Sequence, residues 1–181
     1  AEKGKILLKN PLLSFRNFQL ITYDLQKSPQ NDIHEKEEIS LSHSKNEEFT
    51  QAASLALFDY LRKSKSKGFV LSLSGGADSS SIAVLIAEMV KRGVAELGTT
   101  GFLQKLHNPF QPATSNPVKE ITGQLLTTAY QGTHNSSPET LNSARGLADS
   151  IGAVFYNWEI SEEVASYTKK IETAVGRKLT W

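Results

Sequence analysis

A short apolar run followed by a double-glycine turn and a helix constrains the fold of this chain more than any other feature. Residues 69–73 read Phe-Val-Leu-Ser-Leu, which is typical of a strand buried in a parallel sheet. Gly75 and Gly76 follow, and apolar residues then recur at helical spacing from 80 to 91. Because a parallel strand must return through a crossover, this order predicts a strand–turn–helix unit of an α/β domain.

The same alternation continues along the chain. We expect further helices over 47–63, 118–124, 138–151 and 161–175, and further strands over 125–130 and 154–160. The first of these helices has a predicted apolar stripe made of Phe49, Ala53, Ala56 and Tyr60, which Leu57 and Leu61 widen. Glycines and prolines between 93 and 117 predict a long loop. The predicted fold class is α/β with a Rossmann-like parallel sheet.

Composition limits the functions that such a domain can have. Twenty Lys and Arg residues oppose 19 Asp and Glu, and a net charge of +1 gives no electrostatic reason to expect nucleic acid or an anionic membrane as partner. Cysteine is absent, which excludes thiolate metal sites and cysteine nucleophiles from these residues. No apolar run approaches the roughly 20 residues of a membrane span, and no signal-peptide pattern opens the sequence. We therefore expect a cytoplasmic protein that acts on small molecules.

Both ends of the sequence suggest a piece of a longer polypeptide. Residues 1–25 contain two β-rich runs around an Asn10-Pro11 turn, and a lone hairpin buries too little apolar surface to be stable. Residues 26–46 are polar, and six acids oppose three lysines over residues 26–48, which indicates an interdomain linker that runs into a helix. We assign residues 47–181 to the amino-terminal part of an α/β domain. The alternative is a complete small domain with a terminal hairpin.

The turn after the first strand has the composition of a phosphate site, Ser-Gly-Gly-Ala-Asp-Ser-Ser over residues 74–80. Glycines let the backbone approach a ligand closely, and the first N–H groups of the next helix attract an anion. No lysine follows the glycines, so this is not the phosphate loop of ordinary nucleoside triphosphatases. Asp78 would repel phosphate unless a cation lies between them, which predicts Mg²⁺ at Asp78. Capping of the helix by Asp78 is the alternative, and both roles are compatible.

The S-G-G-x-D-S pattern of this turn resembles the pyrophosphate-binding loop of the ATP pyrophosphatases. The resemblance implies cleavage of ATP between its α and β phosphates and activation of an acceptor as an adenylate. It also implies ATP-binding residues along the whole turn, with Ser74 in a catalytic role and Asp78 as the metal ligand. The implied ATP-binding residues are Ser72, Leu73, Ser74, Gly75, Gly76, Ala77, Asp78, Ser79 and Ser80.

A second polar turn narrows the resemblance. Residues 135–140 read Asn-Ser-Ser-Pro-Glu-Thr, with Ser136 or Ser137 as the expected N-cap and Pro138 at the first helical position. This stretch is similar to the N-S-S-x-E-T segment of the glutamine-dependent NAD synthetases, where the turn lines the adenine and ribose side of ATP. Tyr130, Asn135 and Ser137 are therefore further implied ATP contacts. The hairpin of residues 5–24 resembles the last strands of the nitrilase-like glutaminase domain that precedes the synthetase domain in that family.

The resemblance implies a ligase of NAD biosynthesis whose synthetase domain is of the adenine nucleotide alpha hydrolase-like type. Its substrates are ATP, deamido-NAD and ammonia from glutamine, its products are NAD, AMP and pyrophosphate, and Mg²⁺ and a homo-oligomer are implied with it. The family's glutaminase nucleophile and its later phosphate-binding segments have no counterpart in this sequence. We therefore expect the chain alone to hold an incomplete site. Two alternatives stay open, another ligase with the same loop and a non-catalytic folded fragment.

Overall fold

The computed structural model describes residues 13–18, 20 and 44–180. Its elements are α1 (Lys45–Ser64), β1 (Phe69–Ser72), α2 (Ala77–Lys105), α3 (Pro117–Leu125), β2 (Leu126–Gly132), α4 (Pro138–Ile151), β3 (Val154–Glu159) and α5 (Ser161–Val175). The three strands form one parallel sheet in the order β1-β2-β3. The predicted α/β class with a Rossmann-like parallel sheet is therefore confirmed for this part of the chain.

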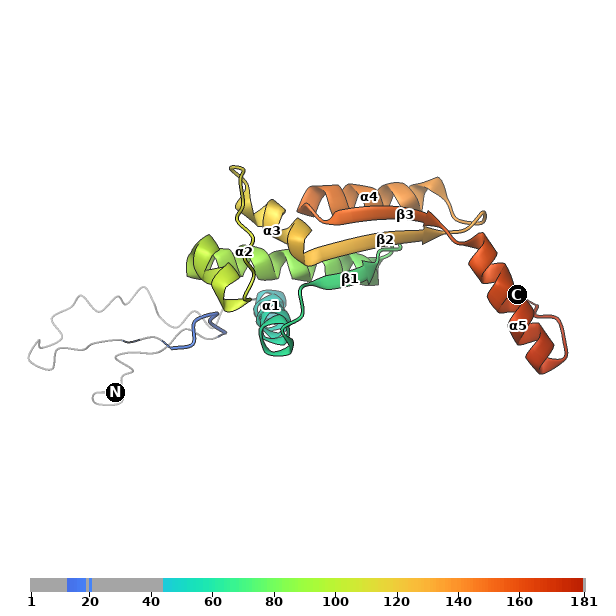
Figure 1. Ribbon diagram of the computed structural model, residues 1–181, viewed down its shortest axis with the longest axis horizontal. Helices are drawn as coiled ribbons and strands as arrows, with labels where there is room; N and C mark the ends of the chain where they lie inside the picture. The colour runs from blue at the N-terminus through green and yellow to red at the C-terminus, as the bar shows by residue number, and fades with distance from the viewer. Residues whose placement is uncertain (1–12, 19, 21–43, 181) are drawn as a thin grey trace, which may run out of the picture.

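Within residues 44–180, helices cover only one face of the sheet. α4 lies along β2 and β3, α2 packs against β1, α3 and α4, and α1 packs on α2 (Figure 1). The covered face carries buried Leu126 and Tyr130, whereas Val70, Tyr156 and Trp158 on the opposite face are 84%, 48% and 49% exposed. α5 has no buried residue and runs away from the end of β3 (Figure 1). The core thus lies between the sheet and the helices on its covered face.

The predicted loop over 93–117 is wrong in its first half, which is helical. α2 continues through Gly93 and changes direction at Gly98, whose φ of 70° and ψ of 162° are not helical. The ring of Phe102 lies against Gly93, where a Cβ would approach the ring to 2.4 Å. Gly93 is therefore required for close packing of the two halves of α2, although in the sequence it resembles a helix breaker. Residues 106–116 are irregular, as predicted.

The buried face of α1 agrees with the predicted stripe only at Leu61. Its buried residues are Ser54, Phe58 and Leu61, whereas Phe49 and Tyr60 are 65% and 59% exposed. Most of the predicted stripe instead lines an open apolar groove between α1 and α2, formed by Ala53, Ala56, Leu57, Tyr60, Ile82 and Leu85. Apolar residues occur around much of this helix, so their spacing alone could not identify the face that meets the core.

Arg92 joins α2 to the start of α1. Its Nη1 and Nη2 atoms donate to the two carboxylate oxygens of Glu47 at 2.7 and 3.2 Å, and its Nε donates to Glu88 at 3.0 Å. The hydrogen bond to Glu47 is the main reason why the pKa of Arg92 is raised. Such a forked pair is stronger than a single ionic contact because both donors are held in the geometry of the carboxylate.

Replacing Arg92 with lysine is expected to lower the free energy of unfolding by about 1 kcal/mol, because an ammonium group cannot bind Glu47 in a fork and keep the bond to Glu88. Urea denaturation of the purified chain measures this difference. Lys169→Arg, a similar exchange on exposed α5, is the control and should leave the midpoint unchanged. Equal midpoints for the two variants would show that the ion pair does not hold α1 to α2.

Two sequence predictions fall largely outside the described residues. The hairpin of residues 5–24 is described only at 13–18 and 20, and the linker of residues 26–46 only at its end, where Ser44 caps α1. The nitrilase-like character of the hairpin therefore stays a prediction. In the described ranges, no helix is both long and apolar enough to cross a membrane.

Candidate functional site

The two predicted turns meet at the carboxyl-terminal edge of the sheet. β1 and β2 are parallel neighbours, so the turns that follow them emerge side by side. A Cβ placed on Gly75 would lie 2.3 Å from the carbonyl oxygen of Thr140, in the first turn of α4. Ser143 on the next turn of α4 donates to the Gly75 carbonyl oxygen at 3.4 Å. The start of α4 therefore forms one wall of the glycine-rich turn.

Hydroxyl groups fix the shape of the glycine-rich turn. The backbone N–H of Ser74 donates to Ser79 Oγ at 3.2 Å, and the N–H of Gly76 donates to Ser74 Oγ at 3.3 Å. Ser79 Oγ lies 3.1 Å from Ser74 Oγ and donates to the Gly76 carbonyl oxygen at 3.3 Å. Gly75 adopts a φ of +81°, a left-handed conformation that glycine enters without strain. Ser74 and Ser79 are thus structural parts of the turn.

The start of α2 leaves backbone donors for an anion. The helix begins at Ala77, three residues before the predicted start at 80, and its N-cap Gly76 provides no side-chain acceptor. Helix geometry leaves the first N–H groups without intrahelical partners, at the positive end of the helix dipole. The alternative in which Asp78 caps the helix is not seen, since Asp78 lies in the first turn itself. A phosphate group would satisfy these donors.

Asp78 supplies the only carboxylate of the glycine-rich turn, and its side chain is exposed. In the described part of the chain, no three His, Asp or Glu residues come close enough together to hold a metal ion. Mg²⁺ commonly uses one or two carboxylates and takes its remaining ligands from substrate phosphates and water. Asp78 therefore fits a cation that arrives with a polyphosphate.

Two of the residues predicted to bind ATP have side chains in the core. Leu73 is fully buried, and its N–H extends the sheet by donating to the Ala129 carbonyl oxygen at 2.9 Å. Tyr130 is 6% exposed, and its hydroxyl oxygen lies 2.7 Å from Thr140 Oγ1. Thr140 in turn lies against Gly75, so Tyr130 supports the glycine-rich turn indirectly, through Thr140. The predicted ATP contacts of these two residues stay predictions.

The second turn is closed by its own hydroxyl groups. Thr133 N–H donates to Ser136 Oγ at 2.9 Å, and Asn135 N–H donates to Thr133 Oγ1 at 3.3 Å. Ser137 is the N-cap of α4 and accepts the Thr140 N–H at 3.4 Å, which decides between the two predicted caps. Asn135 and Ser137 are exposed at the same edge of the sheet as the glycine-rich turn.

The remaining predicted residues lie around the glycine-rich turn. Ala77 is exposed, Ser80 is half-buried, and Ser72 is exposed with its hydroxyl donating to Gln131 at 2.9 Å. Sequence reasoning did not identify Thr140 or Ser143 as contacts of this turn. Thr140 lies in the quoted Asn-Ser-Ser-Pro-Glu-Thr stretch, but a local pattern carries no information on which distant loop it touches.

Glu139, in the first turn of α4, carries a carboxyl group whose pKa is lowered. Its own backbone N–H is the main cause, and the Ser137 hydroxyl adds to it. A lowered pKa in the folded state gives stability that is complete above the ordinary value of 4.5 and is lost as the pH falls below it. In an NMR titration, Glu139 should therefore titrate at lower pH in the chain than in an unfolded peptide of residues 133–145. Equal midpoints would mean that this start of α4 does not bind the carboxylate.

Comparisons with known proteins assign this chain to a family. The family model described as NAD synthase matches residues 49–180, a range that contains both turns. A glutamine-dependent NAD(+) synthetase of Arabidopsis thaliana is 32% identical over 141 residues, which are 75% of this chain and 19% of that protein. The enzyme of the same name from Bos taurus is 38% identical over 118 residues, or 61% of this chain and 16% of that protein.

Similarity to a solved structure supports the same family. The crystal structure of a glutamine-dependent NAD(+) synthetase from Cytophaga hutchinsonii is 54% identical to this chain, with a TM-score of 0.68. It matches 74% of this chain and 24% of its own length. The chain thus spans about a fifth of the length of the curated relatives it matches.

Proposed function

The chain belongs to the NAD synthase family, and from that premise we propose that it provides part of the ATP site of a glutamine-dependent NAD synthetase. The observation that carries the proposal is the glycine-rich turn, where the uncapped start of α2 lies beside the exposed carboxylate of Asp78. The alternative of another ligase with the same loop loses support, because the relatives described above are all named as NAD synthetases.

The reaction that we propose has two steps. A carboxylate oxygen of deamido-NAD attacks the α-phosphorus of ATP, and the bond from this phosphorus to the bridging oxygen breaks, so that pyrophosphate leaves and an adenylate remains. Ammonia derived from glutamine then attacks the acyl carbon, AMP leaves with the bonding electrons, and the amide of NAD results. Charge accumulates on the departing pyrophosphate, so donors fixed in advance at that position lower the barrier.

The residues of this chain have distinct proposed roles in that reaction. The first N–H groups of α2 and the hydroxyl groups of Ser74, Ser79 and Ser80 bind the pyrophosphate, and Ser74 contributes to catalysis. Mg²⁺, bound by Asp78 and the phosphates, would neutralise the charge that these oxygens carry. Asn135 and Ser137 line the adenine and ribose side of ATP. The remaining proposed ATP contacts come from Ser72, Leu73, Gly75, Gly76, Ala77 and Tyr130.

The domain assignment is also a proposal. We propose that residues 47–181 belong to the synthetase domain, that residues 1–25 end a nitrilase-like glutaminase domain, and that residues 26–46 link the two. The family match over residues 49–180 supports the first assignment. The relative from Drosophila melanogaster, which aligns with 84% of this chain at 34% identity, supports continuity with the segment before α1.

The test of the proposed function is a product analysis of the full-length protein that carries this sequence. With ATP, deamido-NAD and an ammonium salt, NAD, AMP and pyrophosphate should form in equal amounts. Xanthosine monophosphate and aspartate serve as control acceptors and should give no AMP. Release of ADP and phosphate, or AMP formation that does not depend on deamido-NAD, would contradict the proposal.

A further inference from the structure

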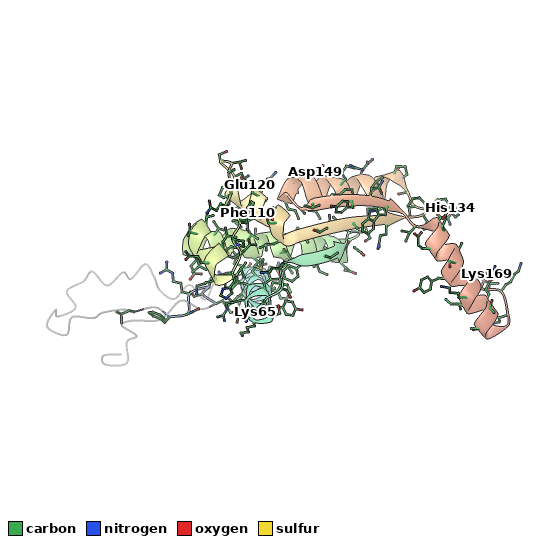
Figure 2. All side chains as sticks on the ribbon, in the orientation of Figure 1. Lys65, Phe110, Glu120, His134, Asp149 and Lys169 are labelled. Carbon is green, nitrogen blue, oxygen red and sulfur yellow. The ribbon has the colours of Figure 1, made fainter. Side chains whose placement is uncertain are left out.

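We propose that Ser161 is a positioning residue that holds the second turn, residues 133–137, in the orientation in which it receives the nucleotide. The proposal rests on the proposed function, since the second turn carries Asn135 and Ser137. Ser161 is the first residue of α5, and it contacts His134 within the turn. Figure 2 shows His134 at the junction between the sheet and α5.

Three hydrogen-bonding groups meet at the Ser161 hydroxyl. Its oxygen accepts the backbone N–H of His134 at 3.1 Å and lies 3.0 Å from His134 Nδ1. The same hydroxyl donates to the carboxylate of Glu159, which also accepts the Ser161 backbone N–H at 3.1 Å. Glu159 is the last residue of β3, so this cluster ties the turn after β2 to the end of the neighbouring strand.

Counting protons places a hydrogen on Nδ1 of the His134 ring. An ionised carboxylate can only accept, so the single hydroxyl proton of Ser161 goes to Glu159. Ser161 Oγ must then accept from His134 Nδ1, which therefore carries a proton. Neutral histidine with this tautomer and charged histidine both satisfy the contact. The cluster can thus hold the turn whether or not the ring is charged.

The remaining bonds of the second turn explain why Ser161 matters for its orientation. Thr133, Asn135 and Ser136 bond to one another, which sets the internal shape of the turn but not its direction. Among the described residues at the start of α5, Ile160 makes the other hydrogen bond to this region. Its backbone N–H donates to the carbonyl oxygen of Gly132, the residue before the turn, at 2.9 Å. α5 buries none of its residues, so apolar packing does not provide this link.

The test compares Ser161→Ala with Ser161→Thr in the full-length enzyme. Loss of the hydroxyl should raise the KM for ATP about fivefold with little change in kcat, because a misdirected turn loses binding that substrate and transition state share. Exchange of the His134 amide proton should become about tenfold faster, and NMR of the ring should show loss of the fixed Nδ1–H tautomer. Thr retains the hydroxyl and should restore all three readouts. If Ser161 served only as the first residue of α5, its replacement by alanine would change neither the KM for ATP nor the tautomer of His134.

Ser150→Ala is the matched control, because Ser150 also bonds locally, donating to the Leu147 carbonyl oxygen at 2.7 Å on α4. It should leave the KM for ATP and the His134 signals unchanged. Normal turnover with an unchanged KM in Ser161→Ala would overturn the positioning role alone. A wild-type enzyme that forms no NAD would overturn the proposed function, and the positioning role with it, even if the His134 amide remains protected.

Discussion

Gly75→Ala is expected to lower the free energy of unfolding by about 3 kcal/mol and to move the glycine-rich turn away from α4. A residue with a side chain at a φ of +81° carries a strain of about 1–2 kcal/mol. The new Cβ would also lie 2.3 Å from the Thr140 carbonyl oxygen, and this backbone atom cannot rotate out of the way. Relief of such an overlap by a shift of packed backbone costs about 1–3 kcal/mol more. Urea denaturation of the variant measures the sum.

Gly146→Ala is the matched control for this prediction. Gly146 lies within α4, and a Cβ there would meet nothing within 4 Å. Alanine is a better helix former than glycine by about 1 kcal/mol, so this variant should be more stable than the parent chain. Opposite signs for the same chemical change would support the contact between Gly75 and α4. A loss of stability of similar size in both variants would contradict it.

Displacement of the turn has a functional consequence. Ser74 and Ser79 fix the turn through short-range bonds, and Ser143 fixes it against α4. If Gly75 is pushed away from Thr140, the last of these bonds breaks and the first N–H groups of α2 lose their set direction. Gly75→Ala should therefore weaken Mg-ATP binding under conditions where the variant is still folded. Gly146→Ala should bind as the parent chain does.

The strand–turn–helix unit could be predicted from sequence because each of its parts has a local cause. The apolar run over 69–73 favours a buried strand, Gly75 supplies a left-handed backbone, and helical spacing follows at once. Pro138 likewise marks the start of α4 by the chemistry of helix starts, although Ser136 and Ser137 were both possible caps. Predictions of this kind depend on residues within a few positions of one another.

The parts that sequence did not give depend on contacts between distant residues. Gly93 resembles a helix breaker until Phe102 is placed against it. The face of α1 that meets the core depends on where α2 lies, so the exposed Tyr60 could not be told from the buried Phe58 by spacing. The contacts of Thr140 with Gly75 and of Ser161 with His134 join separate elements in the same way. The positions of the two turns were predictable, and the contacts that orient them were not.

Asp78→Asn is expected to weaken Mg-ATP binding by at least about tenfold without a measurable loss of stability. The Asp78 side chain is exposed in the first turn of α2, and surface changes of this kind alter stability by about 0.5 kcal/mol or less. A carboxylate within about 4 Å of a cation near a protein surface contributes up to about 4 kcal/mol, well above the 1.4 kcal/mol that a tenfold change requires. Calorimetric titration of both proteins with Mg-ATP measures the difference.

The same pair of proteins should give the opposite order when magnesium is removed. Without a cation, the carboxylate of Asp78 faces phosphate oxygens directly and repels them, so ATP in excess EDTA should bind the asparagine variant at least as tightly as the parent chain. Asp149→Asn removes an equal charge on α4 and should change neither titration, which separates a local effect from one of net charge (Figure 2). A variant that binds ATP more weakly with and without magnesium would show that Asp78 supports the turn rather than the metal. A crossover between the two conditions requires a cation between Asp78 and the phosphates, because no purely structural role of the side chain changes sign with magnesium.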